Sequence, residues 1–194
     1  MSKVIDFYFD FISPYSYIAH QKTKSIDKKD EIEFNYKPIL LGGLHKLGNI
    51  TAPAFNERKM KNMKNDCELI AKKNKISFKW NDKFPINSLY LMRGFISIDP
   101  KIKDQYLDAC FDSYWKNNID ISIEQNVNDI LDTCKLDKKK FFNQINEQQI
   151  KDKLKDLTDE AFELDIFGAP TFVVNKKIFW GQDRLEYALD EYNF

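Results

Sequence analysis

The stretch Phe-Asp-Phe-Ile-Ser-Pro-Tyr-Ser, residues 9–16, decides the fold at the start of the chain. It follows an apolar run, residues 4–9, which is typical of a buried strand, and it leads into a helix-like run over residues 15–25. Ser13 then lies at the N-cap of that helix and Pro14 at its first position, where both residue types are favoured. The sequence therefore predicts a strand, a turn and a helix with an electropositive N-terminus.

A second stretch, Phe-Gly-Ala-Pro-Thr-Phe-Val-Val at residues 167–174, decides the fold near the end of the chain. Its apolar half, residues 171–174, and the run 177–180 are separated by Asn175 and Lys176, which predicts a β-hairpin. Residues 32–36 alternate as a strand does, and the middle of the chain shows helical periodicity. The predicted helices cover residues 57–74, 88–98, 103–116, 123–134 and 138–145, and a long helix begins at Gln149.

Composition narrows the class of protein. The 194 residues are 43% hydrophobic and 14% aromatic, which is enough to fill a core. Thirty basic and thirty acidic residues give zero net charge, which argues against nucleic acid or an anionic membrane as a partner. No apolar run reaches the ~18 residues of a membrane span, and no signal-peptide pattern opens the chain. We therefore expect a cytoplasmic protein without a membrane contact.

Cysteine and histidine usage predicts neither disulfides nor a metal. The three cysteines, Cys67, Cys110 and Cys134, are odd in number and far apart, so we interpret them as reduced core thiols. The two histidines, His20 and His45, form no metal-ligand spacing with an acid or a thiol, so we expect no metal site.

A third stretch, Phe-Trp-Gly-Gln-Asp-Arg-Leu at residues 179–185, completes an ordered set of motifs. Between the outer stretches lie Leu-Gly-Gly at 41–43 with Gly-Asn at 48–49, the run 59–66, and Phe-Pro-Ile-Asn-Ser-Leu at 84–89 with Arg93. Together they resemble the 2-hydroxychromene-2-carboxylate isomerases, relatives of the kappa-class glutathione transferases, over nearly the whole chain.

The resemblance implies an α/β fold, a thioredoxin-like sheet with a large all-helical insertion between its two halves. The sheet domain would comprise residues 1–45 and 150–194, and the helical insertion residues 46–149. The Ser-Pro-Tyr-Ser turn matches the active-site turn of thioredoxins with hydroxyls in place of the Cys-x-x-Cys sulfurs, so redox exchange is excluded but thiol binding is not. The loop at Pro170 corresponds to the one that carries a cis-proline in that fold.

The resemblance also implies glutathione as cofactor and assigns the residues that contact it. Ser13 would hydrogen-bond the glutathione sulfur and stabilise the thiolate, and Ala169, before Pro170, would pair with the cysteinyl part. The start of the last helix, at Gln182, would receive the γ-glutamyl carboxylate, and Asp183 the α-amino group. Asn49 matches a glutathione-contacting asparagine, and Lys59 lies near the mouth of the site, where it could hold a carboxylate. Arg58 competes with Lys59 for that role.

Each of these residues also has a purely structural interpretation. Ser13 alone is most often an N-cap, Asp183 could simply favour a helix start, and Gly-Asn is a common turn. The substrate-binding segment implied by the resemblance comprises Phe84, Pro85, Asn87 and Arg93, although a core salt bridge is an equal alternative for Arg93.

The implied function is a glutathione-dependent isomerase acting on a small-molecule electrophile, an aromatic or conjugated carbonyl compound. In an isomerase the thiolate adds reversibly and glutathione is returned, whereas in a kappa-class-like transferase the thioether is the product. A non-catalytic thioredoxin-like module that binds glutathione or a peptide is a third hypothesis. Relatives also suggest a homodimer.

Overall fold

A mixed four-stranded sheet forms one end of the molecule in this computed structural model, which describes residues 3–26 and 32–193. The strand order is β2-β1-β3-β4, with β1 parallel to β2, and with β3 antiparallel to both β1 and β4. The strands are β1 (Lys3–Phe9), β2 (Ile32–Pro38), β3 (Thr171–Val174) and β4 (Lys177–Trp180). The predicted hairpin is confirmed, and Asn175 and Lys176 at its tip have the positive φ angles, 50° and 65°, of a two-residue turn.

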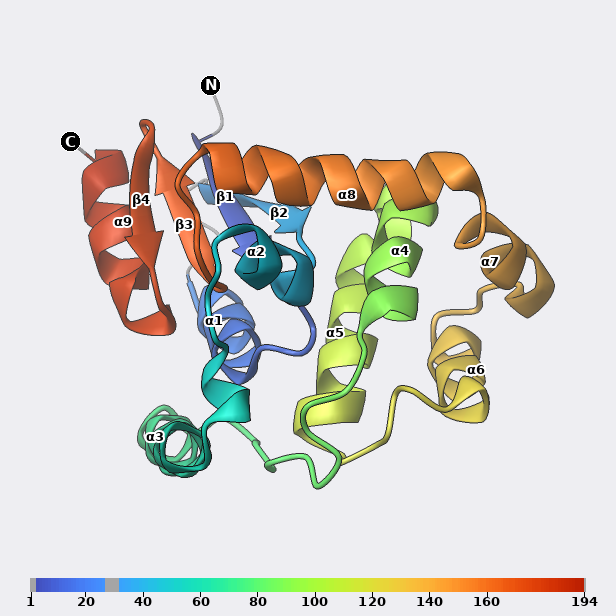
Figure 1. Ribbon diagram of the computed structural model, residues 1–194, viewed down its shortest axis with the longest axis horizontal. Coiled ribbons are helices and arrows are strands. Elements are labelled where there is room, and N and C mark those ends of the chain that lie inside the picture. Colours follow the sequence, from blue (N-terminus) through green and yellow to red (C-terminus); the bar gives the residue numbers. More distant parts are fainter. Residues whose placement is uncertain (1–2, 27–31, 194) are drawn as a thin grey trace.

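Helices occupy most of the chain between β2 and β3, and some of them pack on the sheet. Those outside that middle region are α1 (Pro14–Thr23) and α9 (Leu185–Asn193). Those within it are α2 (Leu41–Leu47), α3 (Glu57–Lys73), α4 (Leu89–Ser97), α5 (Lys103–Trp115), α6 (Glu124–Thr133), α7 (Lys138–Gln144) and α8 (Gln148–Glu163). Short 3-10 turns lie at η2 (Pro53–Phe55), η3 (Pro100–Ile102) and η4 (Gln182–Arg184). Figure 1 shows α8 running from beside the sheet to α7, with α6 and α7 at the end opposite the hairpin.

The sequence predicts these elements well except for α2. Two glycines, Gly42 and Gly43, are poor helix formers, and Leu40 at the N-cap has no side chain that could cap the helix. The backbone N–H at the start of α2 is satisfied instead by a carboxylate from a distant residue, Asp10. Local pattern therefore carries no signal for this helix.

Both faces of β1 are covered. Phe7 and Phe9 are fully buried on one face, where Phe9 packs edge-on against Phe95 of α4 at a ring-centroid distance of 5.2 Å. Tyr8 points to the other face and belongs to a smaller cluster with residues of α2 and α8. Burying each such phenylalanine contributes about 1.5–3 kcal/mol to folding. The sheet and the α4–α5 pair thus share one apolar core.

A glycine allows the central helices to approach closely. At Gly94 in α4, an added Cβ would lie 2.2 Å from the Tyr106 hydroxyl oxygen and 2.5 Å from the Phe141 ring, so no larger residue fits without moving α5 or α7. The division into a discontinuous sheet domain and an insertion at residues 46–149 stays a prediction.

Candidate functional site

Ser13 lies at the N-cap of α1, as the sequence predicts, and its hydroxyl joins the two outer motifs. Its Oγ accepts a hydrogen bond from the backbone N–H of Ser16 at 3.1 Å and donates one to the carbonyl oxygen of Ala169 at 2.9 Å. The side chain is buried, so the hydroxyl is shielded from bulk water. The turn after β1 and the loop before β3 therefore meet at a single hydroxyl.

Ser16 differs from Ser13 although both lie in the first turn of α1. The Oγ atom of Ser16 is buried and makes no hydrogen bond with any described residue. An unpartnered buried hydroxyl lowers stability relative to an apolar group of the same size. The two serines of the Ser-Pro-Tyr-Ser turn are thus distinguished by their partners.

The loop at Pro170 presents backbone groups beside Ser13. The Ala169–Pro170 peptide bond is cis, and the carbonyl oxygen of Pro170 accepts the N–H of Gly181 at 2.9 Å. Within the described part of the chain, no hydrogen bond engages the N–H of Ala169. A free N–H and a carbonyl at one residue can pair with an extended ligand backbone as a neighbouring strand would.

The turn before α9 holds Gln182 and Asp183. Gly181 has a φ of 109°, and a Cβ there would lie 2.5 Å from Oδ1 of Asp183, so only glycine fits. Asp183 is exposed and pairs with the guanidinium of Arg184 at 2.8 Å. Gln182 is buried instead, and its side-chain oxygen accepts a hydrogen bond from the ammonium of Lys22 in α1. Lys22 was not among the residues that the sequence singled out, and its own burial lowers its pKa.

Asn49, between α2 and α3, is exposed, and so are Arg58 and Lys59 of α3. Asn49 follows the C-cap of α2 with a φ of 52°, a left-handed conformation that asparagine tolerates. Lys59 and Arg58 lie in the first turn of α3 and form no ion pair among the described residues. No hydrogen bond connects these three side chains to Ser13, so their place in the site stays a prediction.

The segment before α4 packs partly against the core. The Phe84 ring packs against Trp80 and Trp115 at centroid distances of 5.0 and 5.6 Å, while Pro85 is exposed after a cis peptide bond. The side-chain oxygen of Asn87 accepts the N–H of Leu89 at 2.8 Å. Phe84 and Asn87 thus already have structural roles, and a ligand that binds here would contact them in addition.

Arg93 makes no salt bridge with any described residue, so the core ion pair considered as its alternative role is not formed among them. Its Nε atom is buried without a hydrogen-bond partner, and partial burial lowers its pKa. A half-buried guanidinium in this state is able to receive a carboxylate, because such a group presents paired N–H donors.

Asp10, the residue that follows β1, belongs to this region and was missed by sequence reasoning. Its carboxylate is fully buried and accepts the N–H of Ile12 at 3.1 Å, the N–H of Leu41 at 2.9 Å and the hydroxyl of Ser88 at 2.6 Å. Burial raises the pKa of Asp10, and the three donors act in the opposite direction. The only sequence signal was an acid inside an apolar run.

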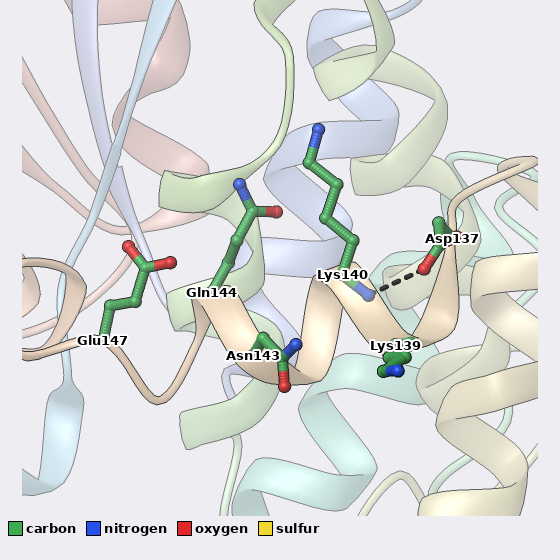
Figure 2. A pocket seen from close by; sticks show the side chains of 6 residues that line it. All are labelled: Asp137, Lys139, Lys140, Asn143, Gln144 and Glu147. Carbon is green, nitrogen blue, oxygen red and sulfur yellow. Dashed lines mark hydrogen bonds between the residues drawn. The ribbon is translucent and has the colours of Figure 1, made fainter.

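A hollow elsewhere on the surface carries none of these residues. It lies along α7, and Figure 2 shows its six lining side chains, with a hydrogen bond from the N–H of Lys140 to Asp137. Figure 1 places α7 far from β3 and α1. Across the described ranges, no three His, Cys, Asp or Glu residues are arranged to hold a metal ion, and no helix is long and apolar enough to cross a membrane. The three cysteines are free and buried, as predicted.

Comparison with known proteins gives a consistent family. Residues 4–193 match the family described as the DSBA-like thioredoxin domain. The 2-hydroxychromene-2-carboxylate isomerase of Sphingobium xenophagum is 27% identical over 192 residues, which cover 96% of each chain. Glutathione S-transferase kappa 1 of Rattus norvegicus is 22% identical over 97% of this chain and 92% of its own.

A solved structure of 2-hydroxychromene-2-carboxylate isomerase superimposes with a TM-score of 0.88 at 24% identity, covering 98% of this chain and 94% of that one. The expected fold class, a thioredoxin-like sheet with a large helical addition, is confirmed by this likeness and by the family match.

Proposed function

Because this chain belongs to the DsbA-like thioredoxin domain family, we propose that it is a glutathione-dependent isomerase resembling 2-hydroxychromene-2-carboxylate isomerase. The observation that carries the proposal is the hydrogen bond from Ser13 to the carbonyl of Ala169. It brings a buried hydroxyl at a helix N-terminus next to a backbone edge that can hold a peptide-like thiol. Disulfide exchange has no reactants here, since positions 13 and 16 are both serine.

The polar groups around Ser13 fit the chemistry of glutathione, a tripeptide with a thiol, an amine and two carboxylates. The free N–H and the carbonyl of Ala169 suit its cysteinyl backbone. Asp183 offers a carboxylate to the α-amino group, and the helix start at Gln182 offers N–H groups to the neighbouring carboxylate. Lys59 or Arg58 would hold the glycyl carboxylate of glutathione. Asn49 would contact the glutathione backbone between its cysteinyl part and that carboxylate. Pro170 shapes the loop that presents Ala169.

Bound glutathione supplies a thiolate that adds reversibly to a conjugated carbonyl substrate. Ser13 has one hydroxyl proton, and in the free protein that proton goes to the carbonyl of Ala169. When a ligand N–H takes this carbonyl, the Ser13 hydroxyl is released to donate to the sulfur. The positive end of α1 adds to the same preference for negative charge.

The electrophile would occupy the side of the site formed by the segment before α4. Phe84 and Pro85 offer apolar surface, Asn87 an amide, and Arg93 a guanidinium without an ion-pair partner among the described residues. A guanidinium suits the carboxylate of a 2-hydroxychromene-2-carboxylate. The free, buried thiols Cys67, Cys110 and Cys134 are consistent with work in the reducing cytoplasm.

A transferase outcome is the second candidate, supported by the likeness to the rat kappa-class enzyme. Both outcomes need the same activated thiolate and differ in whether the thiol leaves the product. The measurement is glutathione consumption during turnover of 2-hydroxychromene-2-carboxylate. The isomerase proposal expects product to form with the glutathione concentration unchanged, and no product without glutathione.

Other results would overturn this proposal. Glutathione lost in step with product would make the protein a transferase. Binding of glutathione in a titration, without turnover of either this substrate or a general electrophile such as chlorodinitrobenzene, would favour the non-catalytic binding module. No binding at millimolar glutathione would remove the cofactor assignment altogether.

A further inference from the structure

Asp10 lies where the N-termini of three helices meet. Its backbone carbonyl accepts the N–H of Ser13, the N-cap of α1, at 3.0 Å. Its Oδ2 atom accepts the N–H of Leu41, the first residue of α2, at 2.9 Å. Its Oδ1 atom accepts the hydroxyl of Ser88, the N-cap of α4, at 2.6 Å, together with the N–H of Ile12. One residue thus connects three helix starts.

Neither α2 nor α4 is capped by its own N-cap side chain. Leu40 at the N-cap of α2 has no polar side chain, and the hydroxyl of Ser88 is turned away from the backbone of α4 to Asp10. No described Lys, Arg or His forms an ion pair with Asp10, so the carboxylate is stabilised by donors and helix dipoles alone. These donors oppose burial, which raises the pKa of Asp10.

Each of the three helices borders a different part of the proposed site. Helix α1 begins just after Ser13, α2 ends just before Asn49, and α4 follows the segment 84–87. We propose that Asp10 is a positioning residue that aligns the Ser13 turn with the cofactor segment after α2 and the substrate segment before α4. This inference rests on the proposed function and adds to it the residue that sets the relative positions of its parts.

The sign of one measurable shift separates positioning from a simple charge effect. A carboxylate near the bound thiolate repels it, so neutralising Asp10 would lower the pKa of the bound thiol if charge alone mattered. Loss of positioning moves the Ser13 hydroxyl away from the sulfur and raises that pKa. Ser88→Ala tests positioning with the carboxyl group still present, because it removes one link. If the loss of this donor neutralised Asp10, the pKa of the bound thiol would fall, opposite in sign to the effect of lost positioning.

The experiment titrates the thiolate absorbance of glutathione bound to the full chain in wild type, Asp10→Asn and Ser88→Ala. An asparagine has one side-chain oxygen, so its NH2 group must face at least one of the donors that now face Asp10. We expect the titration midpoint to rise by about one pH unit in Asp10→Asn, and by a smaller amount in Ser88→Ala. In Ser88→Ala the KM for the electrophile should also rise severalfold, while the Kd for glutathione stays within about twofold.

Tyr106→Phe is the matched control. Like Ser88→Ala, it removes one buried hydroxyl that is hydrogen-bonded, in this case to α4, since the Tyr106 hydroxyl donates to the carbonyl of Leu91 at 3.1 Å. We expect it to lose stability as Ser88→Ala does, without a shift in the midpoint.

A midpoint that is unchanged or lowered in both variants would overturn the positioning role, and so would an equal shift in Tyr106→Phe. If Asp10→Asn does not fold, Ser88→Ala and its control still decide. Failure of the wild type itself to show a thiolate would instead contradict the proposed function, so the two failures are distinguishable.

Discussion

Replacing Ser13 with alanine should raise the pKa of the thiol of bound glutathione by about one to two units. A free cysteine thiol titrates near ~8.5, so a value of about 6.5 requires a preference of about 2.7 kcal/mol for the thiolate. One hydroxyl bond to a charged sulfur supplies about 1.5–3 kcal/mol, and the helix start adds about 0.3–1 kcal/mol. The Ser13 hydroxyl lies at this helix start and donates its proton to the carbonyl of Ala169.

The same arithmetic gives the effect on turnover. A bound thiol with a pKa of about 6.5 is about three-quarters thiolate at neutral pH, and raising that pKa by one to two units lowers the fraction about threefold to 25-fold. Rates of wild type and Ser13→Ala should therefore converge as the pH rises through the higher pKa. The variant also loses an N-cap, which costs about 0.5–2 kcal/mol of stability.

The assay is thiolate absorbance of bound glutathione against pH, with Ser16→Ala as the matched control. Ser16 is a buried hydroxyl of the same turn that has no partner among the described residues, so its removal should leave the titration unchanged and cost little stability. Coincident titration curves for wild type and Ser13→Ala, with only a loss of stability, would reduce Ser13 to a helix cap.

Three further predictions concern other contacts. Asp183→Ala should weaken glutathione binding by about 1.5–3 kcal/mol, measured by calorimetry, and an unchanged Kd would exclude Asp183 from the site. Trp115→Phe removes the 2.8 Å hydrogen bond from the indole Nε1 to the carbonyl of Phe11. It should lower the free energy of unfolding, measured in urea, by about 1–3 kcal/mol. A decrease within experimental error would show that water satisfies that carbonyl. Although burial opposes it, hydrogen bonds from His20 and Lys24 hold the pKa of Asp108 at about 2, below its unfolded value. The stabilising effect of Asp108 should be complete above about pH 4 to 5 and disappear as the pH falls towards 2. The unfolding free energies of wild type and Asp108→Asn should therefore converge towards pH 2. A difference between them that does not depend on pH would contradict the assignment.

Local patterns in the sequence were sufficient for most of the fold. Periodicity or a turn signal within a few residues predicts the strand before Ser13, the hairpin at Asn175 and the helices of the middle region. The N-cap role of Ser13 follows from Ser-Pro alone, and the structure confirms it. Helix α2 could not be predicted, since its first N–H is satisfied by Asp10, which lies 31 residues away.

The same limit applies to the candidate site. Motif order indicated Ser13, Ala169 and Asp183, but no local feature linked Asp10 to Ser88, because their contact spans 78 residues. Lys22 was missed for the same reason, since its partner Gln182 lies 160 residues further along. Local sequence patterns predict the structure of residues that are neighbours in the chain, whereas these pairs form only when the helices pack together.

The convergence of three helix starts on Asp10 has a consequence for the order of folding. Its two distant partners close loops of 31 and 78 residues, and the entropic cost of the longer loop exceeds that of the shorter by only about 0.8 kcal/mol. A nascent strand, turn and helix at the start of the chain could cap itself at Ser13 early, but the carboxylate beneath the turn would stay in water until α4 had been synthesised and docked. We expect the Ser13 turn to reach its native geometry only in the final, cooperative step, so an incompletely folded chain would not yet present the proposed thiol site.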